Sequence, residues 1–359
     1  MAEILIHVLV GNPQSTSVKR IWIYSFILFC IFVYLVIGSG DLKKEEAGMI
    51  FKEFQSEWFD EPVYDEQGFI PYHYKGKTYN LWFGKIGENN KPPLLVIHGG
   101  PGNNHFNLVA LQALGFERPI IFYDQLGCGN SERPYDSSLW LPERFFNEVQ
   151  TVKDFLGLEE YHLLGHSWGT TVATAFAHKH PQGISSLSLH SPILSFPKYL
   201  EEVSPKLKKS LPGNLAEIID ACELEKKDCG ENYENAVFEY VKRYVILTIP
   251  FPEPLKRMIM KRNKELHRVM IHSDSELNIL GNLKDIDVSS SLSKINIPVL
   301  FTCGQSDLCT PEFTLWHYSL TDKADMHIIE NSAHMSPVDN PLKLLNIQME
   351  FMQKHEKNK

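Results

Sequence analysis

The chain has 359 residues, of which 43% are hydrophobic and 22% are charged, a balance that is typical of globular proteins and excludes a wholly disordered chain. This length accommodates one large domain with an insertion, or two domains. The net charge of −9, with no basic run interleaved with aromatic residues, argues against a phosphate-binding surface, so no nucleic acid is expected as a partner.

The N-terminal region contains an uncharged apolar run, residues 21–38, which Lys19 and Arg20 precede. Such a run is about as long as the shortest helix that crosses a bilayer. The basic residues predict a cytoplasmic tail (residues 1–20) and a single-pass signal anchor in the membrane, with the large domain on the extracytoplasmic side. Two alternatives stay open: a signal peptide cleaved near the small residues 38–40, and a buried helix of a soluble protein.

The chain that follows the apolar run predicts an α/β fold. Residues 39–65 form a charged connector that becomes helical, and residues 66–194 hold the first part of the domain. Apolar strand-like runs stand at residues 93–98, 119–124, 161–166 and 184–190, and helical patterns stand at residues 142–158 and 170–181. Strands that alternate with helices indicate a mainly parallel sheet with helices on both faces.

This alternation stops between residues 195 and 290, a stretch that is rich in charge and helix formers and has no comparable apolar strand. Because the stretch is far longer than a normal loop, we predict a helical insertion that forms a cap over the site. A peripheral decoration is the alternative. Residues 291–359 return to the earlier pattern, with an apolar strand at residues 297–304, and complete the α/β domain.

The six cysteines and 15 histidines form no metal-binding pattern, since neither CxxC nor HExxH occurs. No metal is therefore expected. Cys222 and Cys229 can pair if the domain lies in an oxidising compartment, and free thiols are expected for the remaining cysteines.

The stretch GHSWG, residues 165–169, places Ser167 between two glycines, directly after a predicted strand and before a predicted helix. In a G-x-S-x-G turn, the flanking positions must be small for the chain to reverse, and the serine is presented at the end of the strand. The N-terminus of the following helix favours negative charge at that point. We predict that Ser167 is a nucleophile; an ordinary strand-to-helix turn is the alternative.

The stretch HGGPG, residues 98–102, follows another apolar strand and supplies two consecutive glycines. Glycines let the backbone approach a substrate closely, with amides that point into a cavity. In this architecture, an oxyanion hole takes one amide from such a loop and one from the residue after the nucleophile. We therefore predict that Gly100 and Trp168 form the oxyanion hole.

An acid and a base are expected in the order serine, acid, histidine. Asp307 and His334 each follow an apolar strand, at the carboxyl ends where parallel sheets build their sites. Asp307 would accept a hydrogen bond from one imidazole nitrogen and fix the tautomer, so that the other nitrogen takes the proton of Ser167. The predicted catalytic residues are Ser167, Asp307 and His334.

These motifs resemble one family. The HGGPG loop, the stretch YDQLGCGNSERP (residues 123–134), GHSWG, the helical insertion and the late aspartate and histidine are similar to the proline iminopeptidase branch of the α/β-hydrolases. The resemblance runs from about residue 69 to the C-terminus. It implies an α/β-hydrolase fold with a helical cap and a serine aminopeptidase without metal or organic cofactor. It also implies substrates with a free N-terminal amine, namely short peptides or amino-acid amides, whose first residue, often proline, is released through an acyl-enzyme.

The resemblance further implies an acidic anchor for the substrate amine. Residues 273–287, SDSELNILGNLKDID, resemble the family's NEF…G…WD stretch, which carries one substrate-binding glutamate over to Glu276. The stretch departs from the family at Leu277, where an aromatic residue is common, and at Ile286, where tryptophan is usual. Leu308 stands where some members place a second glutamate. Three other acids are alternatives for a second anchor: Glu231, Glu234 and Glu239.

Two other classes of function stay open. An esterase or lipase on the same fold would use the same three catalytic residues but needs no charged anchor such as Glu276 in its cap. A catalytically silent binding protein on a hydrolase scaffold would be expected to lack one of the three, and this chain lacks none. Ser167 argues against the hydrolases of this fold that use an aspartate nucleophile.

Overall fold

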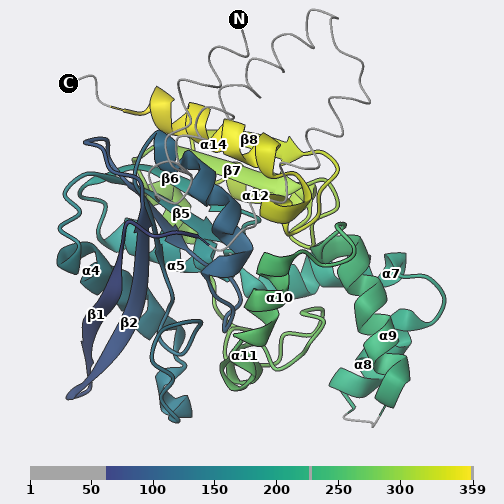
Figure 1. Ribbon diagram of the computed structural model, residues 1–359. Helices are drawn as coiled ribbons and strands as arrows, with labels where there is room; N and C mark the ends of the chain where they lie inside the picture. The colour runs from purple at the N-terminus through teal and green to yellow at the C-terminus, as the bar shows by residue number, and fades with distance from the viewer. Residues whose placement is uncertain (1–61, 226–228, 357–359) are drawn as a thin grey trace, which may run out of the picture. The chain divides into compact units, whose positions relative to one another are not determined.

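A computed structural model describes residues 62–225 and 229–356 of the chain. Within these residues, eight strands form one sheet, in the order β1-β2-β4-β3-β5-β6-β7-β8 (Figure 1). The strands are β1 (Glu66–Tyr74), β2 (Lys77–Ile86), β3 (Leu94–Ile97), β4 (Ile120–Tyr123), β5 (Tyr161–His166), β6 (Ile184–His190), β7 (Val299–Gly304) and β8 (Ala324–Ile329). Strands β3 to β8 pair in parallel, and β1 and β2 add an antiparallel edge.

The central strands are apolar almost throughout because both of their faces are covered. Every residue of β3, β4, β5 and β7 is buried. Leu95, Ile97 and Leu163 from these strands belong to the main hydrophobic core. Near-continuous apolar runs are expected of parallel strands that are buried on both faces. The predicted α/β fold with a mainly parallel sheet is therefore confirmed.

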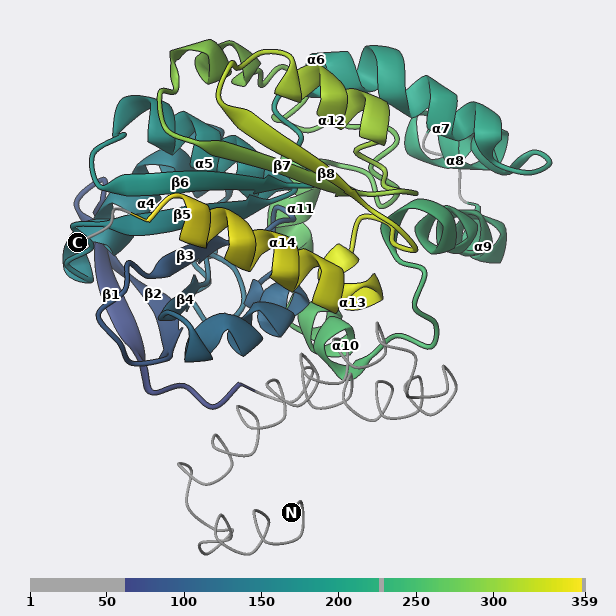
Figure 2. The same cartoon turned by 90° about the horizontal axis from the view of Figure 1, so that it is seen from above.

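Helices cover the two faces of the sheet, as Figure 2 shows: α5 and α12 lie on one face, and α14 lies on the other. The amphipathic helix predicted over residues 142–158 is α4, and its apolar stripe of Phe145, Val149 and Val152 is buried. The elements of this part are the 3-10 helices η1 (His105–Phe116), η2 (Ser137–Leu139) and η5 (Ser289–Lys294) and the α-helices α4 (Pro142–Phe155), α5 (Trp168–Lys179), α12 (Pro311–Tyr318), α13 (Ser336–Asp339) and α14 (Pro341–Lys354).

The chain leaves the sheet after β6 and returns at β7, and the segment between them is helical. It contains α6 (Phe196–Lys198), η3 (Tyr199–Val203), α7 (Ser204–Ser210), α8 (Leu215–Glu223), α9 (Gly230–Tyr240), η4 (Val241–Val245), α10 (Glu253–Met260) and α11 (Lys264–Met270). Figure 1 shows these helices grouped beside the sheet. Cys222 and Cys229 form a disulfide that joins the end of α8 to the start of α9, so the pairing considered from the sequence is present.

The predicted membrane localisation is corrected by the structure. Among the helices of residues 62–225 and 229–356, none is long and apolar enough to cross a membrane. The single-pass protein predicted from the apolar run, with its anchor at residues 21–38 and its large domain extracytoplasmic, is therefore unsupported. The run itself lies outside the described residues. That prediction rested on the length and the lack of charge of this run and on Lys19 and Arg20 before it.

Candidate active site

Ser167 occupies a strained turn between β5 and α5. Its backbone has φ 53° and ψ −124°, which is rare for a residue with a side chain and typical of functional sites. The flanking glycines are required by space: a Cβ on Gly165 would lie 2.3 Å from the carbonyl oxygen of Gly169, and a Cβ on Gly169 would lie 2.3 Å from that of Ile97. The turn is further held by a hydrogen bond from the Ser167 amide to the carbonyl of His190 (3.0 Å).

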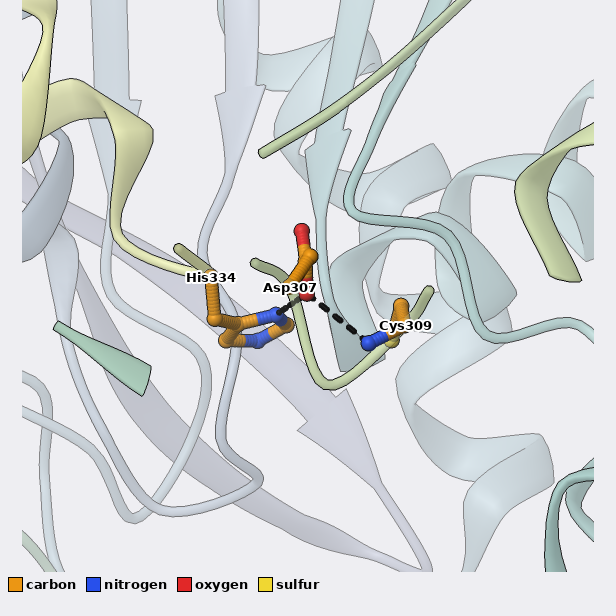
Figure 3. A group of neighbouring side chains, drawn as sticks. All are labelled: Asp307, Cys309 and His334. Carbon is orange, nitrogen blue, oxygen red and sulfur yellow. Dashed lines mark hydrogen bonds and ion pairs between the residues drawn. The ribbon is translucent and has the colours of Figure 1, made fainter. Parts of the chain in front are cut away.

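Asp307 and His334, which come from the loops after β7 and β8, are hydrogen-bonded. Figure 3 shows the imidazole of His334 turned toward the carboxylate, and its Nδ1 lies 2.7 Å from Oδ1 of Asp307. The same oxygen accepts the backbone amide of Cys309 (2.8 Å). The other oxygen, Oδ2, accepts the hydroxyl of Ser191 (2.6 Å) and the amide of Gly304 (3.2 Å). Four donors thus hold this buried carboxylate in one orientation, and it orients the imidazole in turn.

The electrostatics of this pair suit a base. Burial by itself lowers the pKa of His334, but the charge and the hydrogen bond of Asp307 raise it, with a smaller contribution from Glu276, and the net pKa lies above the usual histidine value. A carboxylate beside an imidazole favours the imidazolium that forms when the ring takes a proton. The arrangement therefore supports proton transfer through Nε2, the nitrogen that faces away from Asp307.

Asp307, Cys309 and His334 also lie close enough together to be considered as metal ligands. Their chemistry does not fit that role. Both oxygens of Asp307 are occupied by donors, and Nδ1 of His334 is committed to one of them. Burial raises the pKa of the Cys309 thiol well above its usual value, whereas metals bind the thiolate. The set fits an orienting acid and a base better than a metal centre.

A pocket brings together the predicted site residues that come from different parts of the chain. Gly100, Ser167, Trp168 and Glu276 all line it, and its volume, including the mouth, is about 280 Å³. The rest of its wall is formed by Ile193, Phe196, Tyr199, Ile271, Ile279, Leu308 and Cys309. The wall is therefore mostly apolar, with one carboxylate among the described residues that line it.

His334 is tied to the serine turn through the neighbour of Ser167. The rings of His166 and His334 lie 4.9 Å apart between centroids, and Nε2 of His166 lies 3.1 Å from the carbonyl oxygen of His334. Across the described residues, no hydrogen bond joins the hydroxyl of Ser167 to the imidazole of His334. Such bonds are often long in enzymes without substrate and tighten when substrate binds.

The two predicted oxyanion donors lie beside the serine. A Cβ on Gly99 would lie 3.0 Å from Cβ of Ser167, so the HGGPG backbone passes directly next to the turn. Gly100 has φ +125°, a conformation that favours glycine. Among the described residues, the amides of Gly100 and Trp168 have no acceptor. Two unpaired amides at a pocket that holds a hydroxyl are suited to binding an oxyanion.

Two positioning residues were not singled out from the sequence. Gln125 donates to the carbonyl oxygen of His98 (2.8 Å) and accepts the indole N–H of Trp168 (3.0 Å), so it links the two oxyanion segments. Its place in the YDQ stretch was the available signal. Ser191, which holds Asp307, gave no signal beyond its position after an apolar strand.

Glu276 projects an unpaired carboxylate into the pocket. The residue is half-buried and lines the pocket, and among the described residues its carboxylate has neither a hydrogen bond nor an ion pair. Burial raises the pKa of Glu276 above the usual value, and the charges of His334 and Arg262, which lower it, do not compensate. A carboxylate left without a partner in an apolar wall favours a ligand that brings a positive charge.

The structure does not bring a second acid to this pocket. Glu231 and Glu234 are exposed on α9, and Glu239 pairs with Lys242. None of the three lines the pocket, whereas Leu308 does. Among the described residues that line the pocket, Glu276 is therefore the one that carries a carboxylate.

Comparisons with known proteins agree with the observed fold. A model of the α/β hydrolase fold family matches residues 92–341. The chain is 40% identical over 272 residues to a proline iminopeptidase of Heyndrickxia coagulans, covering 75% of this chain and 94% of the relative. It is 32% identical over 284 residues to one of Lactobacillus helveticus, covering 77% and 96%. A crystal structure of a proline iminopeptidase of Mycobacterium smegmatis superposes with a TM-score of 0.73 and 27% identity, covering 81% of this chain and 98% of that one.

Proposed function

This chain belongs to the α/β-hydrolase fold family and, within it, to the proline iminopeptidases, and we propose that it releases the N-terminal residue of short peptides and amino-acid amides. It is accordingly a serine hydrolase of the aminopeptidase type. The proposal assigns catalysis to Ser167, Asp307 and His334, the oxyanion hole to Gly100 and Trp168, and recognition of the free amine to Glu276.

The proposed reaction follows from the contacts of the site. Nε2 of His334 takes the proton of Ser167 as the hydroxyl oxygen attacks the scissile carbonyl carbon, while Asp307 keeps the proton on Nδ1. The amides of Gly100 and Trp168 donate to the oxyanion that forms. The imidazolium then gives its proton to the leaving amine, which departs and leaves an acyl-enzyme. Water, deprotonated by His334, attacks the ester and releases the amino acid, and the proton returns to Ser167.

The unpaired carboxylate of Glu276 is the observation that supports an aminopeptidase best. The carboxylate of Glu276 and the hydroxyl of Ser167 line the same pocket. Its apolar wall, which includes Ile193, Phe196 and Ile279, suits an apolar side chain such as the proline ring. An α-ammonium group beside that ring would find its partner in Glu276. An uncharged ester has no positive charge that this carboxylate could bind.

Glu276→Gln tests the proposal. A hydrogen bond to a charged group is worth about 1.5–3 kcal/mol, so kcat/KM for proline p-nitroanilide should fall roughly ten- to a hundred-fold. Hydrolysis of uncharged p-nitrophenyl acetate should barely change. Asp285→Asn is the matched control, since it removes an exposed charge from the same segment of the chain and should leave both substrates unaffected.

Blocking the substrate amine with an acyl group should cause a similar loss in the wild type and little further loss in Glu276→Gln. An equal effect of the substitution on both substrates would remove Glu276 as the amine anchor. Faster turnover of the acyl-blocked substrate by the wild type would favour the esterase. No turnover of any substrate would favour the binding protein.

A further inference from the structure

The pocket carboxylate stands on a turn that is held from outside the pocket. Glu276 has φ +59°, a left-handed conformation that a residue with a side chain adopts at a cost and keeps where its surroundings impose it. Its neighbour Leu277 is fixed by a hydrogen bond from the Ser204 hydroxyl to its carbonyl oxygen (2.6 Å). The direction of the Glu276 side chain therefore depends on the groups that bind residues 275–278.

Glu223, the last residue of α8, makes three of those contacts. Its Oε1 accepts the amide of Ser275 (3.1 Å) and the hydroxyl of Tyr233 (2.7 Å). Its Oε2 accepts the hydroxyl of Ser275 (2.9 Å) and the side-chain amide of Asn278 (2.9 Å). This carboxylate is 9% exposed and lies at a helix C-terminus, where the helix dipole disfavours negative charge. The four donors, rather than the helix, therefore stabilise it.

We propose that Glu223 is a positioning residue that sets the orientation of Glu276 and thereby the binding of the substrate amine. The proposal rests on the amine-binding role of Glu276 proposed above. Glu223 does not line the pocket, so it acts through the turn and does not touch substrate. Its bonds to Ser275 and Asn278 hold the turn on both sides of Glu276, and their loss would let the strained residue relax.

The two sides of the turn depend on Glu223 to different degrees. Asn278 has further partners, since its amide also donates to Asp220 (2.8 Å) and its carbonyl oxygen accepts Lys208 (2.7 Å). The amide and the hydroxyl of Ser275 both donate to Glu223. Ser275 is therefore the link that a change at Glu223 disturbs most, and it is adjacent to Glu276.

Glu223→Gln is the direct test, because an amide offers one acceptor oxygen where the carboxylate offers two. Relaxation of one left-handed residue corresponds to roughly a five- to thirty-fold change in an equilibrium. We expect KM for proline p-nitroanilide to rise by about that factor with kcat nearly unchanged, as for a loss of uniform binding. Hydrolysis of p-nitrophenyl acetate should not change. Glu217→Gln, which removes an exposed charge from the same helix, is the control.

Ser275→Ala should also raise KM for proline p-nitroanilide, but by a smaller factor than Glu223→Gln. It is the second variant to measure if Glu223→Gln does not fold. In the Glu276→Gln background, both substitutions should add almost nothing, because residues that act through one another are not additive. A full additional loss in that background would overturn the proposal, as would a parallel loss on ester and anilide. If Glu276→Gln leaves hydrolysis of the anilide unchanged, the proposed amine-binding role of Glu276 is wrong. If Glu276→Gln reduces hydrolysis of the anilide but Glu223→Gln leaves KM unchanged, only the positioning role of Glu223 is wrong.

Discussion

Replacing Gly165 by alanine should disable the enzyme through sterics alone. Gly165 has no positive φ, so the added Cβ imposes no backbone strain of its own. That Cβ would lie 2.3 Å from the carbonyl oxygen of Gly169, 2.6 Å from its carbonyl carbon and 2.8 Å from the amide nitrogen of Thr170. All three are backbone atoms of the first turn of α5. No side chain can rotate to make room.

The size of the effect follows from these distances. Real Cβ atoms essentially never approach a heavy atom closer than 3.0 Å, so the start of α5 must move by about 0.7 Å at the closest contact. The shift would carry Ser167 and the amide of Trp168 with it. A misplacement of about 1 Å reduces catalysis on the order of 10²-fold, and overpacking a core costs about 1–3 kcal/mol.

The assay combines turnover of proline p-nitroanilide with urea unfolding of the same preparation. Gly157→Ala is the matched control: Gly157 has φ +61° with nothing within 4 Å of its Cβ position, so it tests backbone strain without a clash. We expect it to lose a little stability and no activity. Full activity and full stability of Gly165→Ala would show that the turn is not packed as described.

Three further predictions concern the site and the disulfide. Ser167→Ala should lower turnover on the order of 10⁶-fold at an unchanged melting temperature, and more than a hundredth of the wild-type rate would refute Ser167 as the nucleophile. Asp307→Asn should lower turnover roughly 10⁴-fold. Because Asp307 raises the pKa of His334, the same variant should lower that pKa, and the imidazole should stay neutral to a lower pH. The acid limb of the pH–rate profile should therefore shift to lower pH. An acid limb at the wild-type pH would contradict the pairing of Asp307 with His334. Replacing Cys222 and Cys229 by serine should destabilise the fold by roughly 2–3 kcal/mol in urea unfolding, and no loss would show that the disulfide does not constrain the unfolded chain.

The parts of the site that the sequence predicted are those fixed by local sterics or by topology. Gly165 and Gly169 must be glycine because the turn closes within five residues, so the pattern reveals the serine between them. Asp307 and His334 follow apolar strands, and parallel strands bring their carboxyl ends to one edge. The apolar runs that became β3, β5 and β7 were recognisable because strands buried on both faces have few polar residues.

The remaining parts depend on polar contacts between distant residues. Glu223 and Ser275 meet across the cap, and Ser191 meets Asp307 across two strands. Such pairs produce no periodic pattern in the sequence, so the sequence alone does not predict them. The role of Glu276 was predicted from a family resemblance, which did not indicate the left-handed conformation of its backbone. The membrane prediction failed for a different reason: apolar composition by itself does not establish that a segment spans a bilayer.

The path of the chain between β6 and β7 separates the residues proposed for catalysis from the residue proposed for amine binding. These strands pair directly, from Leu187 opposite Val299 to His190 opposite Thr302, although the whole cap is inserted between them. The entropic cost of closing a loop rises slowly with its length. An insertion between β6 and β7 can therefore become longer or shorter while the two strands stay paired. Glu276 belongs to the insertion, whereas Ser167, Asp307 and His334 do not. A change in the insertion can therefore alter the proposed amine anchor while the sheet that carries the proposed catalytic residues keeps its pairing.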